Sequence, residues 1–223
     1  MNAQSNSLTI HVRGIFFDMD GVLISSTASD EKSWLRWAHF HGMEKSFSLK
    51  AIHGIRNVDT LRAIRPDLDA SVELERLDDF DEEEQDGIAV LPGVRRFIAA
   101  LPPESWTIVS SASERIMRGR LECAGIHAAH RIVTANDVIH GKPHPEPYET
   151  GARILGLAPS ECLVIEDAPS GIKSGKAAGC KVLAVLSSHP AADLDEADSI
   201  VPSLDFVTAG PAPDGAILIH LAT

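Results

Sequence analysis

The chain has 223 residues, enough for one substantial hydrophobic core and a small additional domain. Hydrophobic residues make up 44% of the chain and charged residues 23%, the composition of an ordinary globular protein. The formal net charge of -12 argues against nucleic acid and against an anionic membrane surface as partners. An anionic substrate would therefore need a local lysine, a metal ion or a helix N-terminus.

The cysteines and the N-terminal segment indicate a cellular compartment. Cys123, Cys162 and Cys180 are odd in number, far apart and in no Cys-x-x-Cys arrangement, which favours a reducing environment. Residues 1–8 are polar and lack the apolar core of a signal peptide. No apolar stretch approaches the roughly 20 residues needed to span a bilayer. We therefore expect a cytoplasmic protein, and we expect it to be a monomer.

The first predicted element is a buried strand over residues 10–17, whose apolar end is bounded by Gly14 and Gly21. Asp18 and Asp20 follow it directly. Because side chains two apart share one side of a strand, both carboxylates are predicted to face the crevice where parallel sheets bind ligands. Two carboxylates that close need a cation or a shared proton. An isolated Asp-x-Asp-Gly is equally compatible with a simple Asx turn, so the other motifs decide.

The next segment is helical and contains no convincing strand. Helices are predicted around residues 34–40, 58–64 and 70–77. The acidic run 78–86 is interpreted as a solvated helix face that leads to a hinge. A helical segment inserted directly after the first strand indicates a cap over the crevice at the carboxyl end of that strand.

From residue 91 the pattern alternates between strands and helices. Strands are predicted at 106–109, 132–133, 162–165 and 181–185, and helices at 93–101, 113–124, 145–155 and 170–178, with one more strand at 216–219. Strands separated by helices of about 10 to 15 residues are typical of βαβ units and a parallel sheet. We therefore expect an α/β fold with a Rossmann-like parallel-sheet core, residues 1–24 and 89–223, and a small inserted helical cap domain, residues 25–88.

Three further strand ends carry groups suited to phosphate chemistry. Ser110 and Ser111 supply hydroxyls and backbone amides where the chain turns into a helix, although Ser110 alone could be an ordinary N-cap. Lys142 lies in a stiff Gly-Lys-Pro turn, which favours it as a phosphate ligand over an ordinary loop lysine. Glu166 and Asp167 end another apolar strand. Buried acids at such a position need a cation, and hard oxygen ligands suit Mg²⁺.

Together these residues resemble the haloacid dehalogenase superfamily of aspartyl phosphoryl-transfer enzymes. Its four motifs occur in order, as DMDGV at 18–22, Ser110, Lys142 and ED at 166–167. The helices at about 25–88 resemble the small cap of the subgroup that contains β-phosphoglucomutase and many sugar phosphatases. The chain is more similar still to the 2-deoxyglucose-6-phosphate and glycerol-phosphate phosphatases, in HGIR at 53–56, TANDV at 134–138, GKPHPEPY at 141–148 and EDAPSGI from 166.

The resemblance implies roles for two aspartates. Asp18 would be the nucleophile, attacking phosphorus to give an aspartyl phosphate. Asp20 would protonate the leaving alcohol and then activate the water that hydrolyses the intermediate. A dehalogenase proper is disfavoured, because Asp20 and the metal acids have no role in that reaction.

The resemblance also implies a metal site and a phosphate site. Mg²⁺ would be held by Asp18, by the backbone carbonyl of Asp20 and by Asp167, with Glu166 supporting the metal or the lysine. Ser110 and Lys142 would hold the remaining phosphate oxygens, with Ser111 as a further contact for the substrate.

Substrate choice is predicted to lie in the cap. His53, Arg56 and Asn57 resemble the cap loop that dips towards the leaving group, although His53 and Arg56 could instead cap a helix at the surface. The predicted activity is Mg²⁺-dependent hydrolysis of small sugar or polyol phosphate monoesters. A β-phosphoglucomutase-like phosphomutase and a non-catalytic binding protein remain as alternatives. The mutase is disfavoured by His53 in place of its cap lysine and by Ser25-Ser26 in place of an acid.

Overall fold

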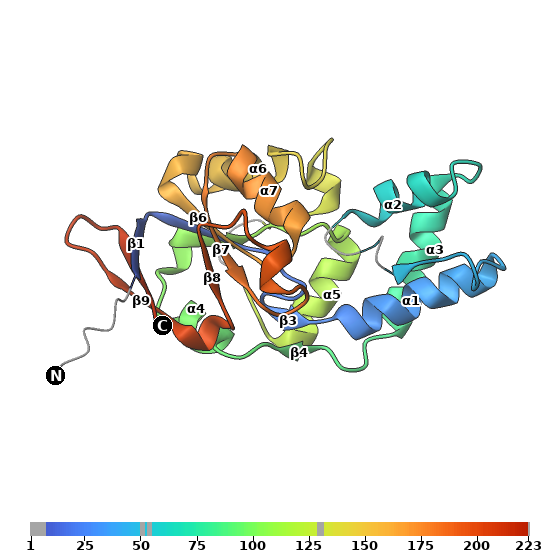
Figure 1. Cartoon of the computed structure of the whole chain (residues 1–223), viewed down its shortest axis with the longest axis horizontal. Helices are drawn as coiled ribbons and strands as arrows, with labels where there is room; N and C mark the ends of the chain where they lie inside the picture. The colour runs from blue at the N-terminus through green and yellow to red at the C-terminus, as the bar shows by residue number, and fades with distance from the viewer. Residues whose placement is uncertain (1–7, 50–51, 53–54, 129–131, 223) are drawn as a thin grey trace.

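The computed structural model describes residues 8–49, 52, 55–128 and 132–222. The molecule is elongated, with a sheet and its flanking helices on one side and the helices α1, α2 and α3 on the other (Figure 1). No helix in this described part is both long enough and apolar enough to cross a membrane.

Among the described residues, the larger sheet has five parallel strands in the order β5-β2-β6-β7-β8. These strands are β2 (Gly14–Phe17), β5 (Trp106–Ile108), β6 (Cys162–Glu166), β7 (Lys181–Val185) and β8 (Ser199–Val201). In the register, Phe17 lies opposite both Ile108 and Ile165, so the three strands end at one level. The predicted α/β fold with a parallel sheet is confirmed.

Helices cover both faces of this sheet, which explains why its central strands are continuous apolar runs. They are α4 (Val94–Ala99), α5 (Glu114–Ala124), α6 (Glu146–Leu155) and α7 (Pro169–Ala177). Phe17 packs in the cluster that includes Phe97 of α4, whereas Phe16 points to the other face and packs with Tyr148 of α6. Each fully buried phenylalanine contributes about 1.5 to 3 kcal/mol. This packing anchors β2 directly before Asp18.

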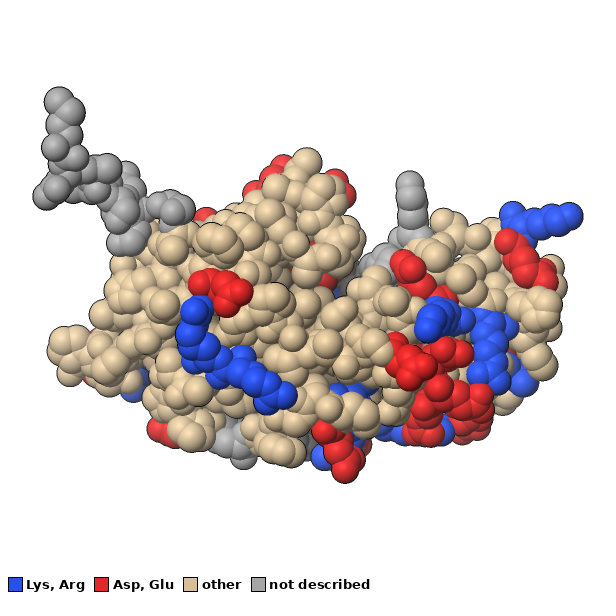
Figure 2. All heavy atoms as spheres, turned by 90° about the horizontal axis from the view of Figure 1, so that it is seen from below, with Lys and Arg blue, Asp and Glu red and all other residues tan. Residues whose placement is uncertain are grey.

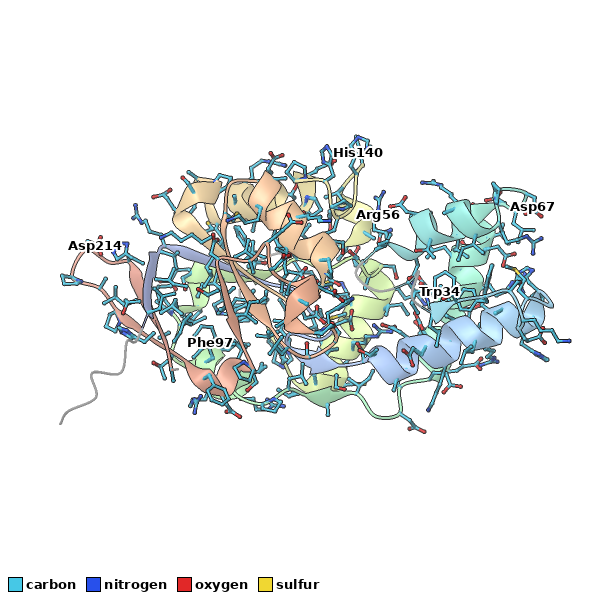
Figure 3. All side chains as sticks on the ribbon, in the orientation of Figure 1. Trp34, Arg56, Asp67, Phe97, His140 and Asp214 are labelled. Carbon is cyan, nitrogen blue, oxygen red and sulfur yellow. The ribbon has the colours of Figure 1, made fainter. Side chains whose placement is uncertain are left out.

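The remaining helices form a lobe with its own apolar cluster. They are α1 (Thr27–Phe40), α2 (Asn57–Ile64) and α3 (Ala70–Glu83). Trp34, Trp37 and Leu77 belong to the cluster, and the Trp37 indole donates to Glu73 Oε2 at 2.8 Å. Figure 3 shows Trp34 inside this lobe, and Figure 2 shows acidic and basic side chains interspersed over the face of the lobe that is in view.

The chain enters and leaves this lobe through two short paired strands. β3 (Ile24–Ser25) pairs antiparallel with β4 (Ala89–Val90), so the two connections lie side by side. The division into a cap domain, residues 25–88, and a core stays a prediction, and this strand pair lies at its two ends.

The prediction of one strand over residues 10–17 is wrong. The structure has two strands that belong to different sheets, β1 (Leu8–Val12) and β2. β1 pairs antiparallel with β10 (Ile217–Leu221), which pairs in turn with β9 (Val207–Pro211). Buried Ile10 and Val12 alternate with exposed Thr9 and His11, the pattern of an antiparallel strand with one solvated face. The strand predicted at 216–219 is confirmed as β10.

The interpretation of residues 78–86 as a solvated face is also wrong in part. α3 extends through Glu83, and both Asp78 and Asp81 are buried. The two aspartates are three residues apart and therefore share the face of α3 that meets α5. Ser113 donates to Asp78 Oδ2 at 2.7 Å. Asp78 and Asp81, which the charge pattern placed in solvent, are therefore buried against polar side chains of α5.

Candidate active site

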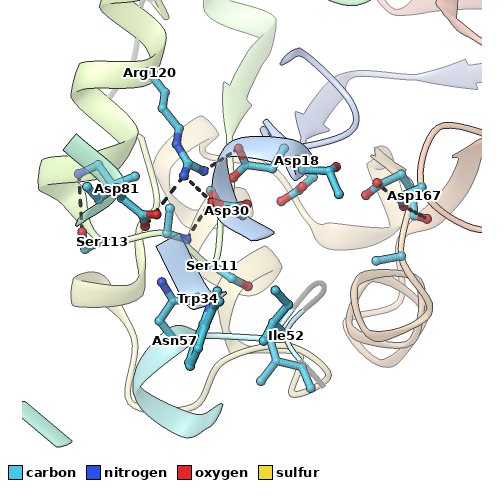
Figure 4. A pocket seen from close by; sticks show the side chains of 18 residues that line it. Asp18, Asp30, Trp34, Ile52, Asn57, Asp81, Ser111, Ser113, Arg120 and Asp167 are labelled. Atoms are coloured by element: carbon cyan, nitrogen blue, oxygen red, sulfur yellow. Dashed lines mark hydrogen bonds and ion pairs between the residues drawn. The ribbon is translucent and has the colours of Figure 1, made fainter. Parts of the chain in front are cut away.

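A pocket lies at the carboxyl edge of the sheet, between the sheet and the lobe formed by α1 to α3 (Figure 4). Asp18 follows β2, and its amide donates to the Ile165 carbonyl at 3.0 Å. Ser110 follows β5, and its amide donates to the Val133 carbonyl at 2.9 Å. The parallel register therefore brings residues far apart in the sequence to one edge. The predicted site residues among the pocket's lining are Asp18, Asp20, Asn57, Ser110, Ser111 and Asp167.

Lys142 lies at the base of this site with 2% of its side chain exposed. Its ammonium donates to Asp18 Oδ1 at 2.6 Å, to Glu166 Oε1 at 2.6 Å and to the Val109 carbonyl at 3.1 Å. Burial acts to lower the pKa of Lys142, but the Asp18 and Glu166 carboxylates outweigh it and raise that pKa. The lysine is therefore a permanent cation that orients one Asp18 oxygen and leaves the other available for reaction.

Carboxylates crowd the site. Burial raises the pKa of Asp18 well above its ordinary value, and the neighbouring Glu166 and Asp167 act in the same direction against Lys142. Burial and the charge of Glu166 likewise raise the pKa of Asp167 to about 7. Burial first and neighbouring carboxylates second disfavour the charged forms of these acids, so a further cation is favourable here.

Three of these acids are arranged as a metal site would require. Oxygens of Asp18, Glu166 and Asp167 all lie within 4.8 Å of one another, and carboxylate oxygens are ligands for hard divalent cations. Glu166 already has four donors, because Oε1 accepts from Lys142 and Tyr148 and Oε2 from two backbone amides. The donor set therefore fits a divalent cation held chiefly by Asp18 and Asp167, with Glu166 holding the lysine.

Two glycines make this crowding possible. Gly21 has a φ of +80°, and a Cβ there would lie 1.9 Å from Asp167 Oδ2. A Cβ on Gly171 would lie 1.7 Å from Glu166 Oε1. Each glycine thus leaves room for one acid, which is the physical reason for its place in the motif.

The carboxylate of Asp20 is held apart from those acids. Its Oδ1 accepts from Nη1 of Arg120 at 2.9 Å and from the Ser26 hydroxyl. The sequence reasoning did not identify Arg120. A signal was present, because Arg120 lies one turn after Ile116 on the apolar stripe of the predicted helix 113–124. A charged residue on a buried helix face needs a partner, and here that partner is Asp20.

The other predicted site residues divide into two groups. Ser110 and Ser111 line the pocket, and the N-cap of α5 is Ser113, not Ser110. Asn57 lines it from the first turn of α2. Arg56 is not among the lining residues, and His53 lies outside the described residues. Sequence reasoning also missed the lining residues Asp30, Trp34 and Asp81 from α1 and α3.

Arg56 instead ties the lobe to the core. Its guanidinium pairs with Asp59 at 2.7 Å and 3.1 Å and donates to the carbonyls of Val138 at 3.1 Å and Ile139 at 3.0 Å. Figure 3 shows it between α2 and the loop that carries His140. Gly141 lies against the arginine side chain, since a Cβ there would be 2.5 Å from Nε. In this arrangement the donors of Arg56 are occupied away from the pocket.

Comparison with curated proteins gives close relatives over nearly the whole chain. Hexitol phosphatase A of Escherichia coli is 39% identical over 213 residues, which span 93% of this chain and 99% of that protein. Glycerol-1-phosphate phosphohydrolase 2 of Saccharomyces cerevisiae is 29% identical, over 94% of this chain and 90% of that protein.

Solved structures share the fold. A hydrolase from Pseudomonas syringae superposes with a TM-score of 0.79 at 23% identity, over 86% of this chain and 94% of its own. β-Phosphoglucomutase from Clostridium difficile gives 0.76 at 23% identity, over 87% and 92%. The family model described as haloacid dehalogenase-like hydrolase matches residues 15–185, which hold the strands β5, β6 and β7, nearly all of β2, the helical lobe and the acidic site. This chain therefore belongs to the haloacid dehalogenase-like hydrolases.

Proposed function

We propose that the protein is a Mg²⁺-dependent phosphatase that hydrolyses small sugar or polyol phosphate monoesters through an aspartyl phosphate on Asp18. One observation carries the proposal: Lys142 orients the buried Asp18 carboxylate at 2.6 Å, beside Asp167 and inside a pocket closed by the helical lobe. The 39% identity to a hexitol phosphatase supports the substrate class. We further propose that residues 25–88 act as the cap domain and that residues 1–24 and 89–223 act as the catalytic core.

The chemistry follows from the places of the two aspartates. The Asp18 oxygen that Lys142 does not bind attacks phosphorus, the bond from phosphorus to the leaving oxygen breaks, and Asp20 gives its proton to the leaving alcohol. Asp20 then takes a proton from water, which attacks the phosphorus of the aspartyl phosphate and releases inorganic phosphate. Ser110 and Ser111 bind the phosphoryl oxygens while the two bonds exchange, and Lys142, whose three N–H groups are held by Asp18, Glu166 and the Val109 carbonyl, keeps the nucleophile oriented.

A magnesium ion held by Asp18 and Asp167 would neutralise charge on the transferring phosphoryl group when bound. We expect a chelator to abolish hydrolysis of p-nitrophenyl phosphate and Mg²⁺ to restore it. Ca²⁺ should not restore it, because its larger and looser coordination shell misplaces the nucleophile. Release of p-nitrophenol followed by absorbance is the measurement. Full turnover by the chelated, metal-free protein would contradict the metal assignment.

The lining of the pocket favours a small neutral leaving group. Its volume is about 80 Å³, and the lobe contributes Trp34 and Asn57 together with the carboxylates of Asp30 and Asp81. Hydroxyl groups can donate to such acceptors, whereas a second phosphate would meet like charge. A phosphomutase has to bind a bisphosphate, so this lining favours hydrolysis of polyol or sugar monophosphates.

The choice between phosphatase and mutase is tested with two incubations. With hexitol phosphates, hexose 6-phosphates or glycerol phosphate, inorganic phosphate should accumulate with many turnovers per enzyme. With β-glucose 1-phosphate and a trace of the bisphosphate, phosphate release should exceed formation of glucose 6-phosphate. Isomerisation that far outpaces phosphate release would identify a mutase instead.

We propose a cytoplasmic monomer, because the net charge is -12 and because Cys162 and Cys180 are buried as thiols without a disulfide. The partner would be the small phosphorylated substrate itself.

A further inference from the structure

Arg120 is a core residue whose side chain contacts acids from three separate elements. It belongs to α5, and only 4% of its side chain is exposed. Nη1 donates to Asp20 Oδ1 at 2.9 Å, Nη2 donates to Asp30 of α1, and Asp81 Oδ2 of α3 lies 3.8 Å from Nη2. Figure 4 shows the guanidinium reaching between Asp30 and Asp81. One cation thus joins the Asp-x-Asp motif to two helices of the lobe.

These contacts occupy one side of the Asp20 carboxylate. Oδ1 accepts from both Arg120 and the Ser26 hydroxyl, and the proton exchanged with the leaving alcohol is therefore assigned to the other oxygen. The guanidinium is planar and rigid, so it can fix the orientation of a carboxylate where a flexible ammonium could not. Arg120 also depends on the position of the lobe, because Asp30 and Asp81 move with α1 and α3.

We propose that Arg120 is a positioning residue that couples the lobe of α1 to α3 to the general acid Asp20. With the lobe placed as here, Asp30 and Asp81 hold the guanidinium so that it orients Asp20 towards the leaving oxygen. Asp81 Oδ1 has no hydrogen-bond partner among the described residues, and Arg120 pairs with the other oxygen of this buried carboxylate at 3.8 Å. The inference rests on the proposed phosphatase reaction and adds a positioning role for Arg120 to it.

The test compares two substrates on the same protein sample. A hexitol phosphate has a poor leaving group that needs a proton, whereas p-nitrophenolate leaves without one. The ratio of the two kcat/KM values reports only the steps up to the aspartyl phosphate, and it is unaffected by the fraction of protein that is folded. General acid catalysis contributes about 10² to 10⁴-fold to the rate. The change in the ratio of the two kcat/KM values in Asp20→Asn measures this contribution for the protein.

We expect Arg120→Lys and Arg120→Met to lower kcat/KM for the hexitol phosphate by about 10- to 100-fold. The kcat/KM for p-nitrophenyl phosphate should change by less than about 3-fold. The ratio of the two kcat/KM values should therefore shift in the same direction as in Asp20→Asn, but by a smaller factor. Equal losses on both substrates would overturn the proposal, because a residue with a merely structural role does not distinguish leaving groups. An unchanged ratio in an active, folded Arg120→Lys protein would overturn it as well.

Asp30→Asn and Asp81→Asn test the coupling itself, since neither residue contacts Asp20 in the described hydrogen bonds. Both variants should shift the same ratio in the same direction, by about 3- to 10-fold, a fraction of the general-acid contribution. If neither does, the lobe does not act through Arg120. Because both aspartates also line the pocket, each is combined with Arg120→Met, and no further shift of the ratio is expected in that background. A shift of the same size there would mean that the aspartate acts on the substrate and not through Arg120.

Arg115→Gln is the matched control. Arg115 also reaches from α5 to α3, pairing with Asp79 at 2.9 Å and with Glu82, but it is half exposed and does not line the pocket. This variant should keep the parental ratio. Measurements on the parent protein distinguish the two hypotheses. If the parent does not hydrolyse the hexitol phosphate, the proposed function is wrong. If the parent is active and the variants have an unshifted ratio, only the positioning role of Arg120 is wrong.

Discussion

Replacement of Asp18 by asparagine is expected to abolish phosphate release from every ester, including p-nitrophenyl phosphate. The amide is a poor nucleophile, so no aspartyl phosphate forms and the covalent route is closed. Loss of a nucleophile lowers turnover by about 10⁴-fold or more. The measurement is a steady-state phosphate assay combined with mass spectrometry of the acid-quenched protein, in which the parent shows a phosphorylated fraction and Asp18→Asn shows none.

The Asp18→Asn protein should remain folded. Asparagine has nearly the same volume, and Lys142 keeps Glu166 and the Val109 carbonyl as acceptors. Asp195→Asn is the control, because Asp195 is exposed and follows the sheet strand β7 by ten residues without lining the pocket. Residual turnover of Asp18→Asn within about 10-fold of the parent would exclude Asp18 as nucleophile.

Lys142→Met is expected to cost both activity and stability. The buried ammonium is the shared cation of Asp18 and Glu166, each at 2.6 Å. Removing one partner of a buried ion pair leaves uncompensated charge and costs about 3 to 5 kcal/mol of unfolding free energy. Turnover should fall by at least about 10²-fold, because the ammonium that orients the nucleophile Asp18 is lost. Denaturant unfolding and phosphate release measure the two effects.

Lys176→Met is the matched control for this effect. Lys176 pairs with Asp198 at the surface, where both side chains are well exposed. Such pairs contribute about 0 to 1 kcal/mol, so stability and activity should stay close to those of the parent. A Lys142→Met protein as stable as Lys176→Met would mean that the two acids do not depend on the lysine for charge compensation.

The parallel sheet was predictable because its signals are local. Short apolar runs such as Ile15-Phe16-Phe17 and Cys162–Ile165 have strand length and are bounded by glycine or acidic residues. Parallel strands place their carboxyl ends at one edge, so the motifs that follow them could be brought together without knowing the sheet order. The same reasoning failed for residues 10–17, since Arg13 separates two strands whose different partners lie more than 90 residues away along the chain.

The acids of α3 show where local pattern is insufficient. An acidic run on a helix is usually solvated, and nothing near residues 78–86 indicates that Ser113 and Arg120 will pack against it. Arg56 is a similar case. Its acceptors in the core are the backbone carbonyls of Val138 and Ile139, and a sequence pattern does not indicate which backbone carbonyls an arginine will bind. Burial of a charge depends on long-range partners, so charge pattern alone cannot assign it.

The sequence by itself determined the class of fold, the inserted helices and the identity of the acids, serines and lysine at the strand ends. Those features follow from strand length, hydrophobic period and turn residues, which act over a few neighbours. Only the tertiary structure decided that Lys142 holds Asp18 and Glu166 together, that Arg56 binds the core loop, and that Arg120 joins Asp20 to the helical lobe. The Lys142–Glu166 contact spans 24 residues of sequence, and the contacts of Arg56 with Ile139, Arg120 with Asp20 and Lys142 with Asp18 span 83, 100 and 124. All of them depend on distances of a few ångströms, which only the packing of whole elements sets.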